Sequence, residues 1–388
     1  MNTLSPRQAS ELAAMAYRAK GASKVLDVRS IVGPNLRNSF EFVTGDSVVD
    51  GVSGGFFSHL FGLSTGFAFV GKGINEFAGD SVIAIRGTAS LRDGLTDLNC
   101  GLSASSSNKM VHAGFNKTFN SMKQAFAQFV DSNRKAGNTG VVHCVGHSLG
   151  GALAQLTADW VNTEYSLPTK LYTFGAPRVG KTDFARSTTT KLENIYRSTH
   201  GADPVPKVPL WPFIHAPFNG SEFRLDDGQG LNVSAHKLDG TPGYLNTASA
   251  SDWSTLKQRS DNFLSQPVRL RFEDRAQASF SSHWADKISS ALITLLKDSG
   301  YYTAVVTQAA ISSSLTFYDM VARTLEQVAK ASARFAEQTL GLLGHMLVFA
   351  GKVVGKAFEL TYKMIKWVFD STMGALYRSV RGALNGLD

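Results

Sequence analysis

The segment from Gly146 to Gly150, with the sequence GHSLG, constrains the fold of this chain more than any other feature. The apolar run 141–146 leads into it, and a helix-forming run follows it. So tight a turn between a strand and a helix leaves no room for side chains two positions before and after the serine, so both are glycine. The turn lifts the Ser148 hydroxyl clear of the sheet. The segment therefore predicts a nucleophilic Ser148, with the N–H of Leu149 as a donor to an oxyanion.

Strand-like and helix-like runs alternate around this segment. The strand-like runs cover residues 67–70, 81–86, 141–146, 170–174 and 194–197, and amphipathic stretches at 114–133 and 149–161 lie between them. Such alternation is typical of a mainly parallel sheet with helices on both faces. Another helix is expected to begin at Pro6, with Ser5 as its N-cap. Residues 222–235 are expected to form a β-hairpin around an Asp-Asp-Gly-Gln-Gly turn.

The composition indicates a large core and a modest basic excess. Of 388 residues, 43% are hydrophobic, and 39 Lys and Arg residues oppose 31 Asp and Glu residues, which gives a net charge of +8. This excess suits an anionic partner such as a phospholipid surface, and it equally suits a surface that only keeps the protein in solution. No nucleic-acid-binding motif is present, so we expect no nucleic-acid partner. We also expect no metal and no cofactor.

The cysteines and the N-terminal sequence indicate the cellular compartment in which the protein folds. The two cysteines, Cys100 and Cys144, provide no disulfide framework, and Cys144 lies in an apolar run expected to be a core strand. This fits folding in a reducing cytosol. The N-terminal sequence has no basic segment followed by an apolar one, so we expect no Sec signal peptide. Export would then need a specialised secretion route.

Four segments together resemble the class 3, or fungal-type, lipase family. They are 85–88 (IRGT), 111–115 (VHAGF), 146–154 (GHSLGGALA) and 172–180 (YTFGAPRVG), and they occur in the family's order. The resemblance covers roughly residues 81–244 and implies an α/β-hydrolase fold and a serine esterase that acts on lipids. It also implies that Thr88 supplies the second oxyanion donor through its backbone N–H. A simple strand-end turn is the alternative interpretation of Thr88.

The order of catalytic groups in α/β hydrolases narrows the search for the acid. The acid follows the serine in the chain and lies at the end of a strand. Asp203 comes after the strand-like run 194–197, and its Asp-Pro-Val-Pro sequence resembles the family's D-x-V-P acid. Asp183 is the competitor, but it lies in a helix-like GKTDFAR segment. We therefore predict Asp203 as the acid that orients the base.

Four histidines follow Asp203 and are candidates for the base: His215, His236, His283 and His345. The segment from His215 to Glu222 resembles the family's structural H-x-x-x-E segment. His345 lies in an apolar helical run, where a core or membrane-facing position is expected. His236 has Gly243-Tyr244 close behind it, which resembles the H-x(n)-Y context of the family's catalytic histidine. We predict His236 as the base, with His283 as the alternative.

The segment between Thr88 and Ser106 corresponds to the short amphipathic lid of class 3 lipases. Leu91, Leu95 and Leu98 recur there at helical spacing. Many relatives have Asp-Trp where this chain has Asp-Gly at positions 93–94, and the glycine loosens a helix by about 1 kcal/mol. An ordinary surface loop is the alternative.

The resemblance does not extend beyond about residue 302, so we expect a catalytic domain at 1–302 and a helical region at 303–388. The apolar run 340–350 is too short to span a bilayer. Lysines at 352, 356, 363 and 366 alternate with apolar residues, which is typical of a basic amphipathic helix. Three interpretations compete: membrane-surface binding, docking on the catalytic domain or on a partner, and a bundle that closes its own core.

Three functions are compatible with these features. The first is a lipid esterase, with phospholipid a better candidate substrate than triacylglycerol. The second is a catalytically inactive binding protein on a lipase scaffold, against which the intact Ser148, Asp203 and Thr88 argue. The third adds a biological role, because the chain resembles bacterial class 3 lipase effectors of type VI secretion. Such an effector acts on target-cell membranes and is paired with an immunity protein.

Overall fold

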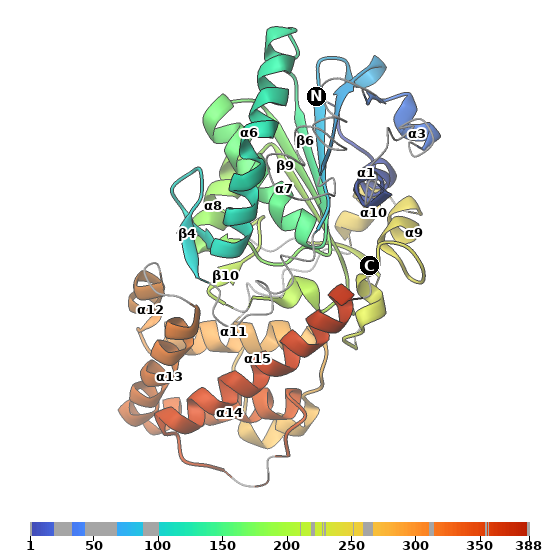
Figure 1. Ribbon diagram of the computed structural model, residues 1–388. Coiled ribbons are helices and arrows are strands. Elements are labelled where there is room, and N and C mark those ends of the chain that lie inside the picture. The colour runs from blue at the N-terminus through green and yellow to red at the C-terminus, as the bar shows by residue number, and fades with distance from the viewer. Residues whose placement is uncertain are drawn as a thin grey trace.

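The computed structural model of the chain (Figure 1) describes residues 2–18, 33–42, 68–87, 101–209, 211–218, 222–226, 228, 230–250, 252–258, 267–309, 314–353, 355 and 357–385. Thr88, Cys100 and the rest of the predicted lid up to residue 100 lie outside these residues, whereas Leu102–Ala104 near its end form a strand. A seven-stranded sheet forms the centre of the molecule. Its strands, in spatial order, are β1 (Phe40–Glu41), β2 (Ala68–Gly73), β3 (Ser81–Ile85), β6 (Val142–His147), β7 (Thr169–Phe174), β9 (Asn194–His200) and β11 (Phe223–Asp226).

The strands from β3 to β11 run parallel, whereas β1 and β2 pair antiparallel at one edge. The mainly parallel sheet predicted from the sequence is confirmed. A smaller antiparallel sheet joins β10 (Phe213–Ile214), β8 (Gly180–Lys181), β5 (Met110–His112) and β4 (Leu102–Ala104). With helices on both faces of the main sheet and a strand–turn–helix unit at Ser148, the chain has an α/β-hydrolase fold.

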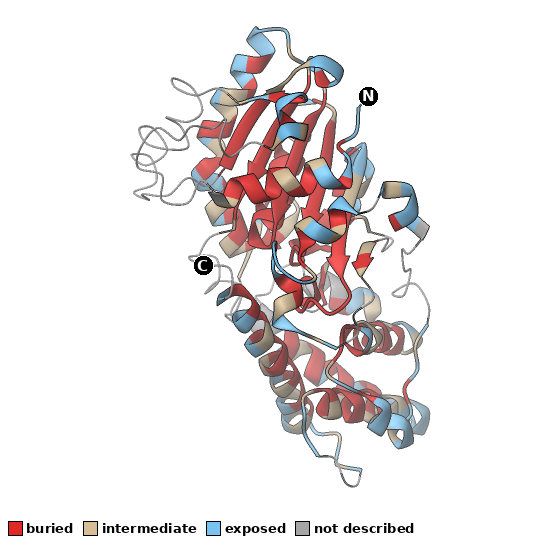
Figure 2. Cartoon of the chain, turned by 90° about the vertical axis from the view of Figure 1, so that its right-hand side faces the viewer, coloured by how far each residue is buried: buried red, intermediate tan, exposed pale blue. Residues whose placement is uncertain are grey.

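Helices cover both faces of the main sheet (Figure 1). One face carries α6 (Ala113–Lys135), α7 (Leu149–Trp160) and α8 (Thr182–Lys191), and the other carries α1 (Pro6–Arg18), α9 (Tyr244–Ser249) and α10 (Trp253–Gln258). Alternate residues of β3 serve the two faces, since Ile83 and Ile85 belong to one buried cluster, and Val82 and Ala84 to the other. The central strands β3, β6 and β7 are buried along their length (Figure 2).

The first helix begins where the sequence predicts. Ser5 Oγ accepts the N–H of Gln8 (3.1 Å), and Gln8 Oε1 accepts the N–H of Ser5 (2.9 Å). This reciprocal pair is a capping box, which satisfies two backbone donors that a helix N-terminus leaves open. The helix then packs on the sheet with Leu12 and Met15 buried.

The β-hairpin expected at 222–235 is wrong. Its first arm, β11, pairs in parallel with β9 at the edge of the main sheet. Phe223 there joins an aromatic cluster with Tyr196 and Trp253, which gives this pairing more buried surface than a two-stranded hairpin offers. Asp226 Oδ1 accepts the N–H groups of Gly201 and Gly228, which ends the strand. Residues 233–236 form instead a 3₁₀ turn, η5 (Val233–His236).

A helical layer lies at one end of the main sheet (Figures 1 and 2). It consists of η7 (Phe272–Gln277), α11 (Ser282–Asp298), α12 (Tyr302–Ala309), α13 (Ser314–Ala331), α14 (Ala333–Phe349) and α15 (Tyr362–Asn385). α11 packs against α14 although it lies before residue 303. Within the described residues, no helix is long and apolar enough to cross a bilayer. The division of the chain at residue 302 stays a prediction.

The single amphipathic helix expected from Lys352 onward is also wrong, because α14 ends at Phe349 and the next helix starts at Tyr362. Gly351 takes a left-handed conformation (φ +73°), and the N–H of Lys352 donates to the carbonyl of Leu347. This is a Schellman ending, which glycine favours because it has no Cβ. The apolar side of α15 is then buried against α13 and α14.

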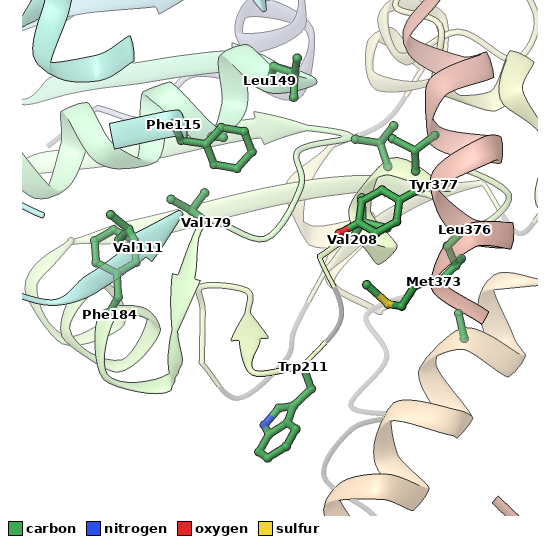
Figure 3. Close-up of a cluster of buried hydrophobic side chains, with 14 of the residues drawn as sticks. Val111, Phe115, Leu149, Val179, Phe184, Val208, Trp211, Met373, Leu376 and Tyr377 are labelled. Atoms are coloured by element: carbon green, nitrogen blue, oxygen red, sulfur yellow. The ribbon is translucent and has the colours of Figure 1, made fainter. Parts of the chain in front are cut away.

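The core is continuous between the sheet and the helical layer. One buried cluster contains Leu149 and Val208 from the hydrolase fold and Met373 and Leu376 from α15 (Figure 3). We therefore predict that Leu376→Ala lowers the free energy of unfolding of the whole protein by about 2–5 kcal/mol. Urea unfolding followed by circular dichroism and by tryptophan fluorescence should show one shifted transition. The exposed Arg378→Ala is the matched control on the same helix. Two separate transitions, with only one shifted, would contradict this prediction.

Candidate active site

Ser148 lies on a strained turn between β6 and α7. Its backbone has φ 57° and ψ −132°, a region that residues other than glycine rarely adopt. A Cβ on Gly146 would lie 2.2 Å from the carbonyl oxygen of Gly150, and a Cβ on Gly150 would lie 2.2 Å from that of Ile85. The two glycines are therefore required for different reasons. The first lets the turn close on itself, and the second lets it approach the neighbouring strand β3.

The structure brings Ser148, His236 and Asp203 together. Ser148 Oγ lies 2.7 Å from His236 Nε2, and His236 Nδ1 lies 2.8 Å from Asp203 Oδ2. All three residues are fully buried. Since the carboxylate can only accept, Nδ1 carries the proton and Nε2 accepts the hydroxyl of Ser148. These groups come from three parts of the chain, namely the turn after β6, the loop after β9, and η5.

The Asp203 carboxylate receives two further hydrogen bonds. The N–H of Val205 donates to Oδ1 (2.9 Å), and the hydroxyl of Tyr244 donates to Oδ2 (2.7 Å). Gly175, at the end of β7, makes this approach possible, because a Cβ there would lie 2.6 Å from Oδ2. Its φ of +57° also favours glycine. Both oxygens of the buried charge are thus supplied with donors, as a carboxylate removed from water requires.

Two more histidines hold the turn that carries His236. His147 Nε2–H donates to the carbonyl of His236 (2.9 Å), and the two rings stack with centroids 4.9 Å apart. His200 Nδ1–H donates to the carbonyl of Ala235 (2.6 Å), and its ring stacks on Tyr244 at 3.9 Å. The backbone N–H of His200 also donates to the hydroxyl of Tyr244 (2.9 Å). One connected network therefore joins the turn of Ser148, the turn of His236 and the Asp203 carboxylate.

Burial keeps these supporting rings neutral. It lowers the pKa of His147 well below its usual range, and the neighbouring His236 lowers it further. Burial also lowers the pKa of His200. A neutral His147 donates through Nε2, which leaves Nδ1 to accept the hydroxyl of Tyr17 on α1 (3.1 Å). The first helix of the chain is thereby connected to the site.

The N–H of Leu149 opens α7, where the N-terminus of a helix favours negative charge. Gly87, which follows β3, packs against it, since a Cβ on Gly87 would lie 3.4 Å from the nitrogen of Leu149. The segment that leads to Thr88 therefore reaches the turn of Ser148. Thr88 itself lies outside the described residues, so its role as the second donor stays a prediction.

The other candidates lie elsewhere. Asp183 is exposed in the first turn of α8, and His283 is exposed in the first turn of α11. His215 Nε2 donates a hydrogen bond to the carbonyl oxygen of Pro206 (2.7 Å). His345 is buried in α14, with its ring stacked on a tryptophan, so it occupies a core position rather than a membrane-facing one.

Sequence reasoning missed three of the supporting groups. The sequence indicates Tyr244 only as context for His236, and it assigns no role to His147 or His200. His147 stands inside the GHSLG motif, and His200 stands three positions before Asp203, so position beside the motif was the signal available. Cys144 is buried on β6, and burial raises the pKa of its thiol, as expected for a core residue. Among the described residues, no cluster of His, Cys, Asp or Glu could hold a metal ion.

Comparison with known proteins agrees with the motifs. Residues 82–213 match the family model "Lipase (class 3)". The chain is 35% identical over 152 residues to secreted mono- and diacylglycerol lipase 1 of Fusarium solani, which is 38% of this chain and 44% of the relative. It is 42% identical over 73 residues to toxin TseL of Vibrio cholerae, which is 18% of this chain and 11% of the relative. The resemblance to class 3 lipases is confirmed.

The chain matches less than half of the length of these curated relatives. Solved structures that are similar include mono- and diacylglycerol lipase from Aspergillus oryzae, at 23% identity and a TM-score of 0.41, over 56% of this chain and 76% of that one. Lipase from Rhizopus microsporus var. chinensis is similar at 24% identity and a TM-score of 0.39, over 57% of this chain and 76% of that one.

We predict that Tyr244→Phe lowers kcat/KM for ester hydrolysis about 10- to 100-fold, because a hydrogen bond to a charged group contributes about 1.5–3 kcal/mol. The loss of one of three donors weakens the restraint that keeps the Asp203 carboxylate aligned with His236. Steady-state kinetics on a p-nitrophenyl ester would measure the effect. Tyr196→Phe, which removes a hydroxyl on β9 outside the network, is the control. Equal activity in the two variants would remove Tyr244 from the site.

Proposed function

We propose that this protein is a serine esterase that hydrolyses carboxylic ester bonds of lipids. The observation that carries this proposal is the hydrogen-bonded chain from Ser148 through His236 to Asp203 at 2.7 and 2.8 Å. An inactive binding protein would have no need of a buried carboxylate aligned on a histidine and a serine. The match of residues 82–213 to the class 3 lipases supports the same activity.

The mechanism follows from the positions of these groups. His236 Nε2 takes the proton of Ser148 while Oγ attacks the ester carbonyl, and Asp203 stabilises the imidazolium that forms. The N–H of Leu149, with that of Thr88 in the proposed arrangement, binds the negative oxygen. His236 then protonates the leaving alkoxide, which departs as an alcohol. Water, deprotonated by His236, then attacks the acyl-enzyme; the bond between the acyl carbon and Oγ breaks, His236 returns the proton to Ser148 Oγ, and the fatty acid leaves.

Phospholipid is the substrate that we favour, with triacylglycerol as the alternative. The net charge of +8 attracts an anionic surface, which a triacylglycerol droplet does not itself supply. The relatives point to acylglycerols through the Fusarium enzyme, and to a toxin through the Vibrio protein. The ester chemistry is the same for both substrates, so only product analysis separates them.

We expect the purified protein to release fatty acid and lysophospholipid from phosphatidylglycerol vesicles, with slower release from a triolein emulsion. Ser148→Ala should reduce both rates by at least about 10⁴-fold, since loss of a triad member leaves only residual catalysis. Mass spectrometry of the products identifies the bond that is cleaved. Unchanged hydrolysis in Ser148→Ala would refute the proposed nucleophile.

We further propose that the helical layer meets the membrane around the start of α15. Val353 is fully exposed and Trp367 is 46% exposed, so two large apolar side chains face solvent just before and in the first turns of α15. The exposed Lys352 and Lys363 lie near them in the sequence. Aromatic and basic groups of this kind favour the interface between lipid headgroups and acyl chains.

Vesicle sedimentation would test this surface. Trp367→Ser should weaken binding to both neutral and anionic vesicles about 3- to 10-fold, through lost apolar contact. Lys363→Ser should weaken binding to anionic vesicles alone, and more so at low salt. Undiminished binding of both variants would place the membrane contact elsewhere.

The biological role that we propose is a secreted antibacterial lipase effector with a cognate immunity protein. The similarity to toxin TseL over a short segment supports it. A neighbouring gene for a periplasmic immunity protein would strengthen the proposal. Harmless production of the active protein in a bacterial periplasm would count against it.

A further inference from the structure

The turn η5, which carries His236, is supported from two sides. On the sheet side, the rings of His147 and His200 donate to the carbonyls of His236 and Ala235. On the other side lies α15, which contacts η5 more than 120 residues further along the chain. The hydrogen bonds restrain one face of the turn. Its other face depends on how closely the helix packs.

α15 approaches this turn closely at Gly382. A Cβ atom placed on Gly382 would lie 3.1 Å from Cγ1 of Val233, closer than side chains ordinarily pack. Val233 is the first residue of η5, and His236 is the last. The bare helix backbone at position 382 therefore rests against the turn. A side chain there requires the Val233 side chain, on the first residue of the turn, to give way by a few tenths of an ångström.

The same helical layer holds the loop after Asp203. Val208 in this loop and Tyr377 of α15 belong to one buried cluster, and both are labelled in Figure 3. Lys207 Nζ also lies 2.8 Å from Asp286 Oδ2 on α11, and both side chains are largely buried. The acid and the base thus stand on two loops that face the same set of helices.

We propose that α15 is a positioning element of the active site, and that Gly382 is the positioning residue that sets the place of the His236 turn through its contact with Val233. The proposal rests on the esterase function proposed above. It gives the helical layer a role in catalysis, beyond membrane binding and beyond closing its own core. The site is then incomplete without a segment that lies far outside the lipase-like residues 82–213.

The chemistry makes this contact sensitive. Proton transfer from Ser148 to His236 needs a short, aligned hydrogen bond, and it is 2.7 Å in the structure. Displacement of reacting groups by about 1 Å costs roughly 10²-fold in rate. We expect a shift that passes from Val233 to His236 to lower kcat, and to cost little stability because Val233 is itself 42% exposed.

The test compares two glycines on the same helix in the full-length protein. Gly382→Ala and Gly382→Val should lower kcat by about 3-fold and at least about 10-fold respectively, with KM little changed, as expected for misplaced reacting groups. The rate of Ser148 labelling by a fluorophosphonate should fall in parallel. Gly374→Val is the matched control, because a Cβ at position 374 would meet only the end of the Arg378 side chain, at 3.4 Å.

Rescue separates positioning from stability. Val233→Ala removes the atom that a Cβ at 382 would meet, so the double variant Val233→Ala/Gly382→Val should recover most of the lost kcat and labelling rate. Loss of activity without such recovery, or losses in Gly374→Val equal to those in Gly382→Val, would overturn the proposal. Thermal unfolding checks that each variant is folded. If Gly382→Val does not fold, Gly382→Ala, which adds only one carbon, takes its place in the test. A wild type no more active than Ser148→Ala would instead refute the esterase function.

Discussion

The buried carboxylate of Asp203 is the group on which the arrangement of the site depends. A carboxylate taken out of water must be given donors, because desolvation of an unpaired charge costs more than the folded state can supply. Three donors meet it, from Val205 in its own loop, from Tyr244 at the start of α9 and from His236 in η5. Both α9 and η5 must therefore pack onto the end of β9. The geometry around Ser148 follows from the need to satisfy one buried charge.

Burial also determines the protonation state of the histidine rings that neighbour His236. In the proposed reaction, His236 becomes an imidazolium, and a second positive charge a few ångströms away would oppose that step. His147 lies 4.9 Å from it, ring to ring, and His200 lies behind the same turn. Burial lowers the pKa of both rings, so both stay neutral and serve as donors to carbonyl groups. They hold the turn in place without competing for the proton that His236 must accept.

How much of the site could be predicted depended on how local each signal was. The position of Ser148 follows from a five-residue motif, and that of Asp203 from the end of a strand, so both could be placed from sequence. His236 needed a family resemblance to separate it from three other histidines. The hydrogen bond from Tyr244 to Asp203 joins residues 41 positions apart, and no periodic pattern reports such a contact. The helix break at Gly351 was missed because the pattern on either side of it stays amphipathic.

The division of the site along the chain has a consequence for how it can vary. Residues 82–213 match the lipase family model and contain Ser148 and Asp203, whereas His236 and α15 lie beyond that segment. The proposed nucleophile stands on the turn after β6, in the sheet, whose packing tolerates little change. The proposed base stands on a short turn between the sheet and a helix that packs through a bare backbone at Gly382. In the proposed arrangement, changes in the helical layer reach catalysis through the turn of His236, whereas the strained turn of Ser148 is fixed by its close packing on itself and on β3.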